Sequence, residues 1–172
     1  MIRVDLTQGF STVIDPEYEH EICRFRWKIL RASGKLYACR TRKVSGRSYR
    51  TILMHREILA APRGVLVDHI DGDGLNNTRA NLRLCNGRQN LANRVSTRGR
   101  SRFKGVYWNK DKALWQAQIG CGFFDDGRQR TIYLGRFERE EDAALAYDRK
   151  AIEFHGEFAR TNILPAPPPG SG

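Results

Sequence analysis

The chain has 172 residues, 40% of them hydrophobic, so it is long enough for one ordinary domain or two small ones. With 30 Lys and Arg residues against 19 Asp and Glu, its net charge is +11, which favours a polyanionic partner. No apolar run approaches the roughly 18 residues of a membrane-spanning helix and no secretory signal is recognisable, so we expect a cytoplasmic protein with no membrane partner.

Short elements fill the first half of the chain. We expect strands at residues 10–15, 35–44, 48–54, 65–70 and 81–85, and short helices at 55–61 and 87–94. Turn signals such as Asp15-Pro16 and Ser33-Gly34 separate these elements, and Pro62 ends the first helix. The segment 95–102, VSTRGRSR, has no periodic apolar residues and is predicted to be a linker.

The second half predicts three strands of alternating polarity, at residues 104–109, 114–123 and 130–137. A helix follows from about Glu138, with an acidic first turn. Its apolar stripe comprises Ala144, Tyr147, Ala151 and Phe154. We therefore expect a three-stranded antiparallel sheet with one helix on its apolar face. A Pro/Gly-rich tail, residues 164–172, follows this unit.

The four cysteines are far apart in the sequence: Cys23, Cys39, Cys85 and Cys121. A structural zinc site normally brings a close Cys or His pair, and the sequence has none. We expect reduced and mostly buried thiols.

The stretch VDHIDGDGLNNTRANLR, residues 67–83, connects two predicted strands by more residues than a hairpin turn needs. Asp68 offers a hard oxygen ligand, and the neighbouring His69 can take a proton near neutral pH. Asp68 and Asn90 together provide a two-ligand oxygen site, which suits Mg²⁺ with its remaining waters and a phosphate. The spacing excludes a calcium-binding EF-hand, because Asn76 and Leu82 stand where that loop needs Gly and Glu. The other Asp and Asn residues of the loop are predicted to cap its turns.

The motif D-H-I-D-G-D-G-x-N-N-x-x-x-N-L-R, with M-H-R-E-I-L before it and Q-N-L-A-N-R after it, resembles the HNH nucleases. The resemblance covers residues 50–94 and is closest to the phage and intron-encoded homing endonucleases. It implies a ββα-metal fold that hydrolyses DNA with one divalent ion, either Mg²⁺, Mn²⁺ or another cation.

Carried onto this sequence, the resemblance makes His69 the general base and Asp68 a metal ligand. Asn81 becomes the residue that orients the base and braces the hairpin. Asn90 becomes the second metal ligand, where many family members have a histidine. His55 has no assigned role, and both helix packing and a phosphate contact stay open for it.

Positive charge concentrates around the linker. Residues 83–112 contain nine basic residues and one acid, and a solvated charge run would interleave the signs. The outer face of the predicted C-terminal sheet adds amides and aromatic rings, which can contact base edges in a groove. The candidate DNA-binding residues are Arg98, Arg100, Arg102, Lys104, Tyr107, Asn109, Lys110, Lys112, Gln116, Gln118, Arg128, Arg130, Thr131 and Tyr133. An ordinary solvated sheet face is the alternative.

The segment FKGVYW, with WQAQI, TIYLGRF and EEDAALAYDRKAIEFHG after it, is similar to the plant apetala-two, or ethylene-response-factor-type, DNA-binding domain. The similarity spans nearly all of residues 103–163 and implies a sheet that binds duplex DNA. Where the plant domains favour arginines, this chain has Tyr107, Asn109, Gly120 and Thr131, so the target sequence does not transfer.

Together these features predict an α+β protein. Its expected domains are an HNH nuclease with a β-rich N-terminal extension at 1–94, a basic linker at 95–102, a DNA-binding domain at 103–163 and a tail at 164–172. The expected function is cleavage of double-stranded DNA, by a monomer or a dimer. The alternatives are a sequence-specific DNA-binding protein with an inactive nuclease domain and, more weakly, an RNA-binding protein.

Overall fold

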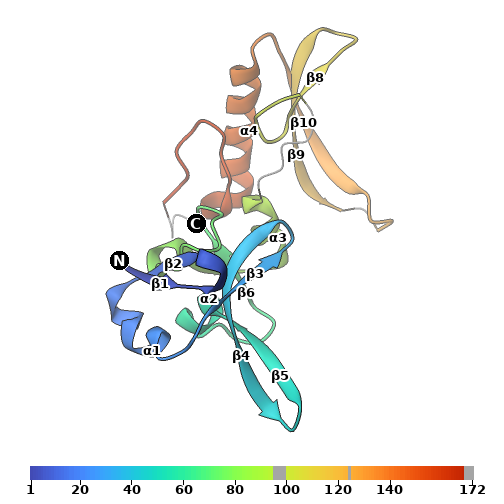
Figure 1. Ribbon diagram of the computed structural model, residues 1–172. Helices are drawn as coiled ribbons and strands as arrows, with labels where there is room; N and C mark the ends of the chain where they lie inside the picture. Colours follow the sequence, from blue (N-terminus) through green and yellow to red (C-terminus); the bar gives the residue numbers. More distant parts are fainter. Residues whose placement is uncertain (95–99, 124, 169–172) are drawn as a thin grey trace. The chain divides into compact units, whose positions relative to one another are not determined.

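A computed structural model describes residues 1–94, 100–123 and 125–168 of the chain (Figure 1). The chain folds into two compact units, Met1–Gly87 and Arg88–Gly172, and each is described by itself. The described residues form small antiparallel sheets and few helices, as expected for an α+β protein. No helix among them is long and apolar enough to cross a membrane. Residues 95–99 of the expected linker and 169–172 of the expected tail lie outside the described residues, and the domain boundaries stay a prediction.

Two-stranded and three-stranded sheets make up most of the first unit. Its strands are β1 (Ile2–Asp5), β2 (Ser11–Ile14), β3 (Lys28–Ala32), β4 (Lys35–Ser45), β5 (Ser48–Leu53), β6 (Leu66–His69) and β7 (Leu82–Cys85). Its helices are α1 (Glu19–Cys23) and α2 (Met54–Ile58), with 3₁₀ turns at Thr7–Gly9, Pro16–Tyr18 and Arg79–Asn81. The sheets are β1–β2, β3–β4–β5 and β6–β7, and all pairs are antiparallel.

One apolar cluster holds these sheets together. Trp27 belongs to this cluster and is 1% exposed, and its indole N–H donates to the carbonyl oxygen of Ile22 at 2.8 Å. This bond satisfies the polar atom that burial of a Trp side chain would otherwise leave unpaired. Ile14 of β2, Met54 of α2 and Leu82 of β7 belong to the same cluster. The N-terminal strands therefore share a core with the β6–β7 hairpin.

The second unit contains α3 (Gly87–Asn93, whose first residue belongs to the first unit), β8 (Val106–Asn109), β9 (Leu114–Phe123), β10 (Gln129–Phe137) and α4 (Glu140–His155). A 3₁₀ turn at Gly156–Phe158 follows α4. The antiparallel sheet has the order β10–β9–β8. Its apolar face, with Ala117 and Ile119, packs with α4 through Ala144 and Tyr147. The expected helix stripe is wrong at its last position, because Phe154 is 44% exposed.

The four cysteines agree only in part with the expectation of reduced and mostly buried thiols. All four cysteines lie in the described residues and are free. Cys39 and Cys85 are buried, whereas Cys23 and Cys121 are exposed, so the thiols are not mostly buried.

Candidate active site

Asp68 and His69 end strand β6, and both are only 5% exposed. Neighbours on a strand point to opposite faces, so the two side chains meet different partners. Asp68 lies opposite Arg83 of β7, whose Nε and Nη2 donate to its Oδ2 at 3.0 and 2.8 Å. The carboxylate is therefore held in place by a largely buried ion pair.

The loop after β6 is built from Asx turns, as its sequence predicts. Asp71 Oδ1 accepts from the backbone N–H of Asp73 at 2.8 Å, and Asp73 Oδ1 accepts from the N–H of Leu75 at 2.9 Å. Asn81 closes the loop from its far end. Its Nδ2 donates to Asp71 Oδ1 and to the carbonyl oxygen of Asn76, and its Oδ1 accepts from the N–H of Asp71. Asn81 thus braces the hairpin through contacts with the loop.

The imidazole of His69 is hydrogen-bonded to a residue that the sequence did not single out. His69 Nε2 lies 3.3 Å from Asn77 Oδ1, and Asn77 is fully buried. The amide orientation follows from its other bonds, since Asn77 Nδ2 donates to Thr12 Oγ1 at 2.7 Å. The Thr12 hydroxyl can accept that bond because its own proton goes to the carbonyl oxygen of Leu75 at 2.6 Å.

This chain of hydrogen bonds assigns the tautomer of His69. Asn77 Oδ1 is an acceptor, so Nε2 carries the proton in the neutral ring and Nδ1 keeps its lone pair. Burial lowers the pKa of His69 below its usual value, although the bond to Asn77 opposes that shift. The ring is therefore neutral at pH 7 and can take a proton at Nδ1.

The N-terminal hairpin fastens the loop that carries Asn77. Val13 of β2 donates to the carbonyl oxygen of Leu75 at 3.0 Å and accepts from the N–H of Asn77 at 2.9 Å. Asp15 Oδ2 accepts from the backbone N–H of Arg79 at 2.6 Å. The β-rich N-terminal extension is thus part of the framework that orients His69.

A second histidine lies against the first. The ring of His55, from α2, is 4.9 Å from that of His69 in an edge-on arrangement, and Tyr37 of β4 lies near both rings. His55 is 6% exposed, and its Nδ1 has no hydrogen-bond partner among the described residues. Burial lowers the pKa of His55 to about 3. Of its two expected roles, burial favours helix packing over a phosphate contact.

The donor chemistry of the expected metal site fits a divalent cation in part. Asp68 supplies a buried carboxylate, but Arg83 already contacts its Oδ2. Asn90 is exposed on α3, in the unit that begins at Arg88. Within the described residues, no three His, Cys, Asp or Glu side chains gather into a metal-binding group.

The outer face of the C-terminal sheet carries a polar row that crosses all three strands. Tyr107 pairs with Gln116, and Gln116 pairs with Arg136. If side chains alternated regularly along β10, Arg136 would lie on the apolar face of the sheet. A register shift between Tyr133 and Gly135 moves it to the outer face, opposite Gln116. Gly135 has φ of 125°, which non-glycine residues rarely adopt. A glycine inside a predicted strand was the available signal for this bulge.

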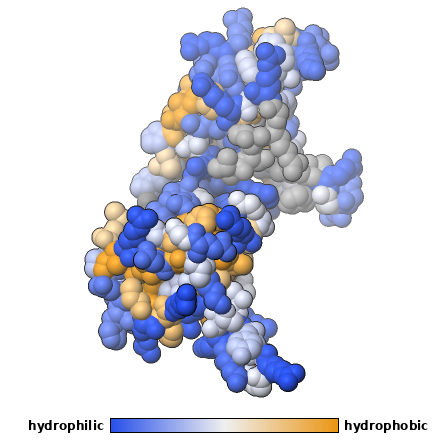
Figure 2. All heavy atoms as spheres, viewed as in Figure 1, coloured by the Kyte–Doolittle hydropathy of each residue, from blue (hydrophilic) through white to orange (hydrophobic). Residues whose placement is uncertain are grey.

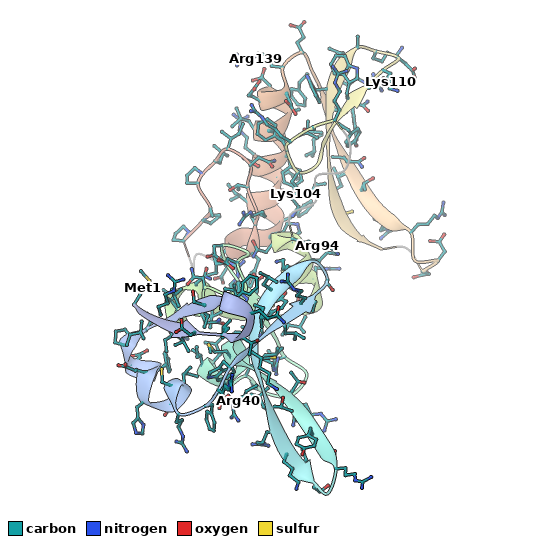
Figure 3. All side chains as sticks on the ribbon, in the orientation of Figure 1. Met1, Arg40, Arg94, Lys104, Lys110 and Arg139 are labelled. Atoms are coloured by element: carbon teal, nitrogen blue, oxygen red, sulfur yellow. The ribbon has the colours of Figure 1, made fainter. Side chains whose placement is uncertain are left out.

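The other candidate DNA-binding residues fall into three groups. Lys110, Lys112, Arg128, Arg130, Thr131 and Tyr133 are exposed, with Lys110 at the β8–β9 turn (Figure 3), while Asn109 and Gln118 are half-buried. Arg100 and Arg102 are exposed before β8, Arg102 in an ion pair with Glu141 at 3.2 Å, and Arg98 lies outside the described residues. Lys104 is half-buried and donates to the carbonyl oxygen of Ala92; burial lowers its pKa to about 8.

Comparison with known proteins gives a match in each half of the chain. Residues 60–92 match the family described as HNH endonuclease. Over 102 residues the chain is 40% identical to ethylene-responsive transcription factor ERF069 of Arabidopsis thaliana, covering 58% of this chain and 60% of that protein. It is 45% identical over 69 residues to APETALA2-like protein 2 of Oryza sativa subsp. indica, which is 40% of this chain and 15% of that protein.

A phage protein is also similar. The chain is 33% identical over 100 residues to protein 3.8 of Escherichia phage T7, covering 58% of this chain and 77% of the phage protein. By contrast, the chain spans less than two thirds of the length of either plant protein.

Proposed function

We propose that this chain is a DNA endonuclease. It belongs to the HNH endonuclease family and to the family of protein 3.8 of phage T7, and it carries an apetala-two-type DNA-binding domain. One observation carries the proposal. His69 is a buried imidazole whose pKa burial lowers, and its hydrogen bond with Asn77 fixes the orientation and tautomer of the ring. A general base needs an unprotonated ring nitrogen at working pH and a fixed orientation. The phage relative supports a phage-borne or mobile enzyme of the homing type.

The proposed reaction is hydrolysis of a phosphodiester bond. His69 Nδ1 takes a proton from a water molecule, whose oxygen attacks the phosphorus in line with the departing 3′ oxygen. The bond between phosphorus and that oxygen breaks, and solvent protonates the leaving oxygen, giving a 5′-phosphate and a 3′-hydroxyl. General base catalysis contributes about 10²–10⁴-fold, so positioning and charge stabilisation must provide most of the acceleration.

We propose Asp68 as a ligand of one divalent ion, Mg²⁺ or Mn²⁺. A carboxylate oxygen suits Mg²⁺, which keeps several waters and binds substrate phosphate. When bound, the ion supplies positive charge for the phosphate and the departing oxygen. Arg83 holds Asp68 in the described arrangement, so the carboxylate must share or exchange this partner when it takes a cation.

The second unit would select the site on duplex DNA through its outer sheet face. The row of Tyr107, Gln116 and Arg136 supports this role, because an amide and a guanidinium can both form paired hydrogen bonds with base edges. The exposed cations at the strand ends would contact phosphates and set the register.

The ion pair between Asp68 and Arg83 favours one alternative, a DNA-binding protein whose nuclease domain is inactive. Nicking of supercoiled plasmid in Mg²⁺, Mn²⁺ and EDTA separates the two functions. The endonuclease proposal expects metal-dependent nicking by the wild type and a loss of about 10²-fold or more in His69→Ala. The matched control is His20→Ala, which changes an exposed histidine of the same unit. Absence of nicking in both metals, or full nicking by His69→Ala, overturns the catalytic assignment.

A further inference from the structure

The β4–β5 hairpin projects from the body of the first unit as an arm (Figure 1). Every residue from Thr41 to Arg50 is exposed, including Val44 and Tyr49 at 59% and 62%. With about 3.3 Å per residue, five residues on each side give an arm roughly 16 Å long. In the view of Figure 2 its surface is blue to white, the colours of hydrophilic and intermediate side chains. A segment this exposed gains little from packing, so its composition reflects what it meets outside the unit.

The arm, defined as residues 41–50, carries only positive charge. It contains Arg42, Lys43, Arg47 and Arg50 and no Asp or Glu. None of the four forms an ion pair or hydrogen bond with another described residue. Arg40, labelled at the base of the hairpin in Figure 3, differs in this respect. It pairs with Glu57 at 2.6 Å and lies 3.8 Å above the ring of Phe25.

The strand register places like charges together. Arg42 of β4 is the direct partner of Arg50 of β5, so both side chains point to the same face. Like charges directly opposite each other destabilise a strand pair. Lys43 pairs with Tyr49 on the other face, so positive charge lies on both faces of the arm. An anion that lies against the arm would relieve the repulsion between Arg42 and Arg50.

We propose that the arm binds duplex DNA by entering the major groove with its cations against the flanking phosphates. A two-stranded ribbon fits the major groove, which is about 12 Å wide and about 8.5 Å deep. Duplex RNA fits less well, because its major groove is too narrow and deep for side chains to reach. This inference rests on the proposed DNA-cleaving function and adds a DNA contact on the nuclease unit itself, independent of the C-terminal sheet.

The first test measures the salt dependence of DNA binding by the full chain, in EDTA to prevent cleavage. One variant replaces all four arm cations by Gln. The matched control replaces four exposed arginines elsewhere in the same unit: Arg3, Arg24, Arg26 and Arg63. A plot of log affinity against log salt concentration has a negative slope, and each lost phosphate contact should reduce the magnitude of that slope by about 0.9. We expect the magnitude to fall by about 2 to 3.5 in the arm variant and by less in the control.

The second test uses the pairing of Arg42 with Arg50 across strands β4 and β5. Arg42→Glu places opposite charges across from each other, so we expect a raised melting temperature together with weaker DNA binding. This combination separates a DNA contact from loss of structure. An arm variant with an unchanged salt slope, or a control with the same decrease, overturns the proposal. So does an equal loss of binding to duplex RNA of the same length.

The two proposals fail in different experiments. If the wild type does not nick plasmid but the arm variant still loses salt-dependent binding, the endonuclease proposal fails and the arm remains a DNA contact. If the wild type nicks plasmid and the arm variant binds DNA with an unchanged slope, the arm proposal fails alone.

Discussion

Replacing Asn77 by leucine tests whether this amide fixes the tautomer of His69. The substitution keeps the approximate side-chain volume but removes the bond from His69 Nε2 at 3.3 Å and the bond to Thr12 at 2.7 Å. A neutral hydrogen bond is worth about 0.5–1.5 kcal/mol, and tenfold in rate corresponds to about 1.4 kcal/mol. We therefore expect nicking to slow by roughly 3- to 10-fold, against about 10²-fold or more when the base itself is removed.

The assay is single-turnover nicking across a pH series, with the protein in excess over plasmid. Asn77→Asp keeps an acceptor for Nε2–H and adds a negative charge, which favours the protonated ring and raises its pKa. We expect this variant to keep a near wild-type maximal rate while the acid limb of its profile moves to higher pH. A merely structural role for Asn77 would not move that limb.

Asn76→Ala is the matched control. It removes bonds to Asp71 and Thr78 in the same loop but none to His69. Its acid limb should stay in place even if its stability falls. Folded Asn77→Leu protein that nicks at the wild-type rate, or an Asn77→Asp profile identical to the wild type, would refute the assignment of the tautomer.

Three further predictions concern stability and reactivity. Burial lowers the pKa of His55 to about 3 in the folded chain, against about 6.5 for a solvated imidazole, so the unfolded chain binds more protons between these pH values. The free energy of unfolding should therefore be highest above about pH 6.5 and fall as the pH drops below it. In urea unfolding at each pH, His55→Leu should flatten this dependence, whereas His20→Leu, at an exposed position, should not. Gly105→Ala should destabilise the second unit by more than about 2 kcal/mol, because its Cβ would lie 2.2 Å from the ring of Tyr147. Gly127→Ala, with a similar positive φ and open space, should cost about 1 kcal/mol in the same thermal unfolding experiment. Burial raises the pKa of Cys85 to about 11, so iodoacetamide should modify it only after unfolding, as mass spectrometry can measure.

The sequence predicted the features that depend on local pattern. The turn chemistry of the loop after β6 follows from Asp and Asn side chains that cap their own backbone, and the structure contains those caps at Asp71 and Asp73. The adjacent Asp68 and His69 could be selected as candidates because their chemistry is evident from residue type. By contrast, strands β1 and β3, which have four and five residues, were missed.

Features that depend on distant contacts could not be read from the sequence. Asn76 and Asn77 look alike as turn residues, and only the packing of β2 distinguishes them by bringing Thr12 to Asn77. The place of Arg136 on the outer face depends on the bulge at Gly135, which reverses the alternation of β10. In both cases a three-dimensional neighbour overrides a local rule.

The hydrogen bond from Asn77 to Thr12 joins residues 65 positions apart in the chain. Local folding of the β6–β7 hairpin alone therefore cannot orient His69, because Thr12, the partner of Asn77, belongs to the N-terminal strands. Catalytic competence should appear only when the whole first unit has folded, whereas the exposed cations of the chain carry their charge at every stage. A nascent or partly unfolded chain would thus attract DNA before it could cut it, and cleavage would report on the completion of folding.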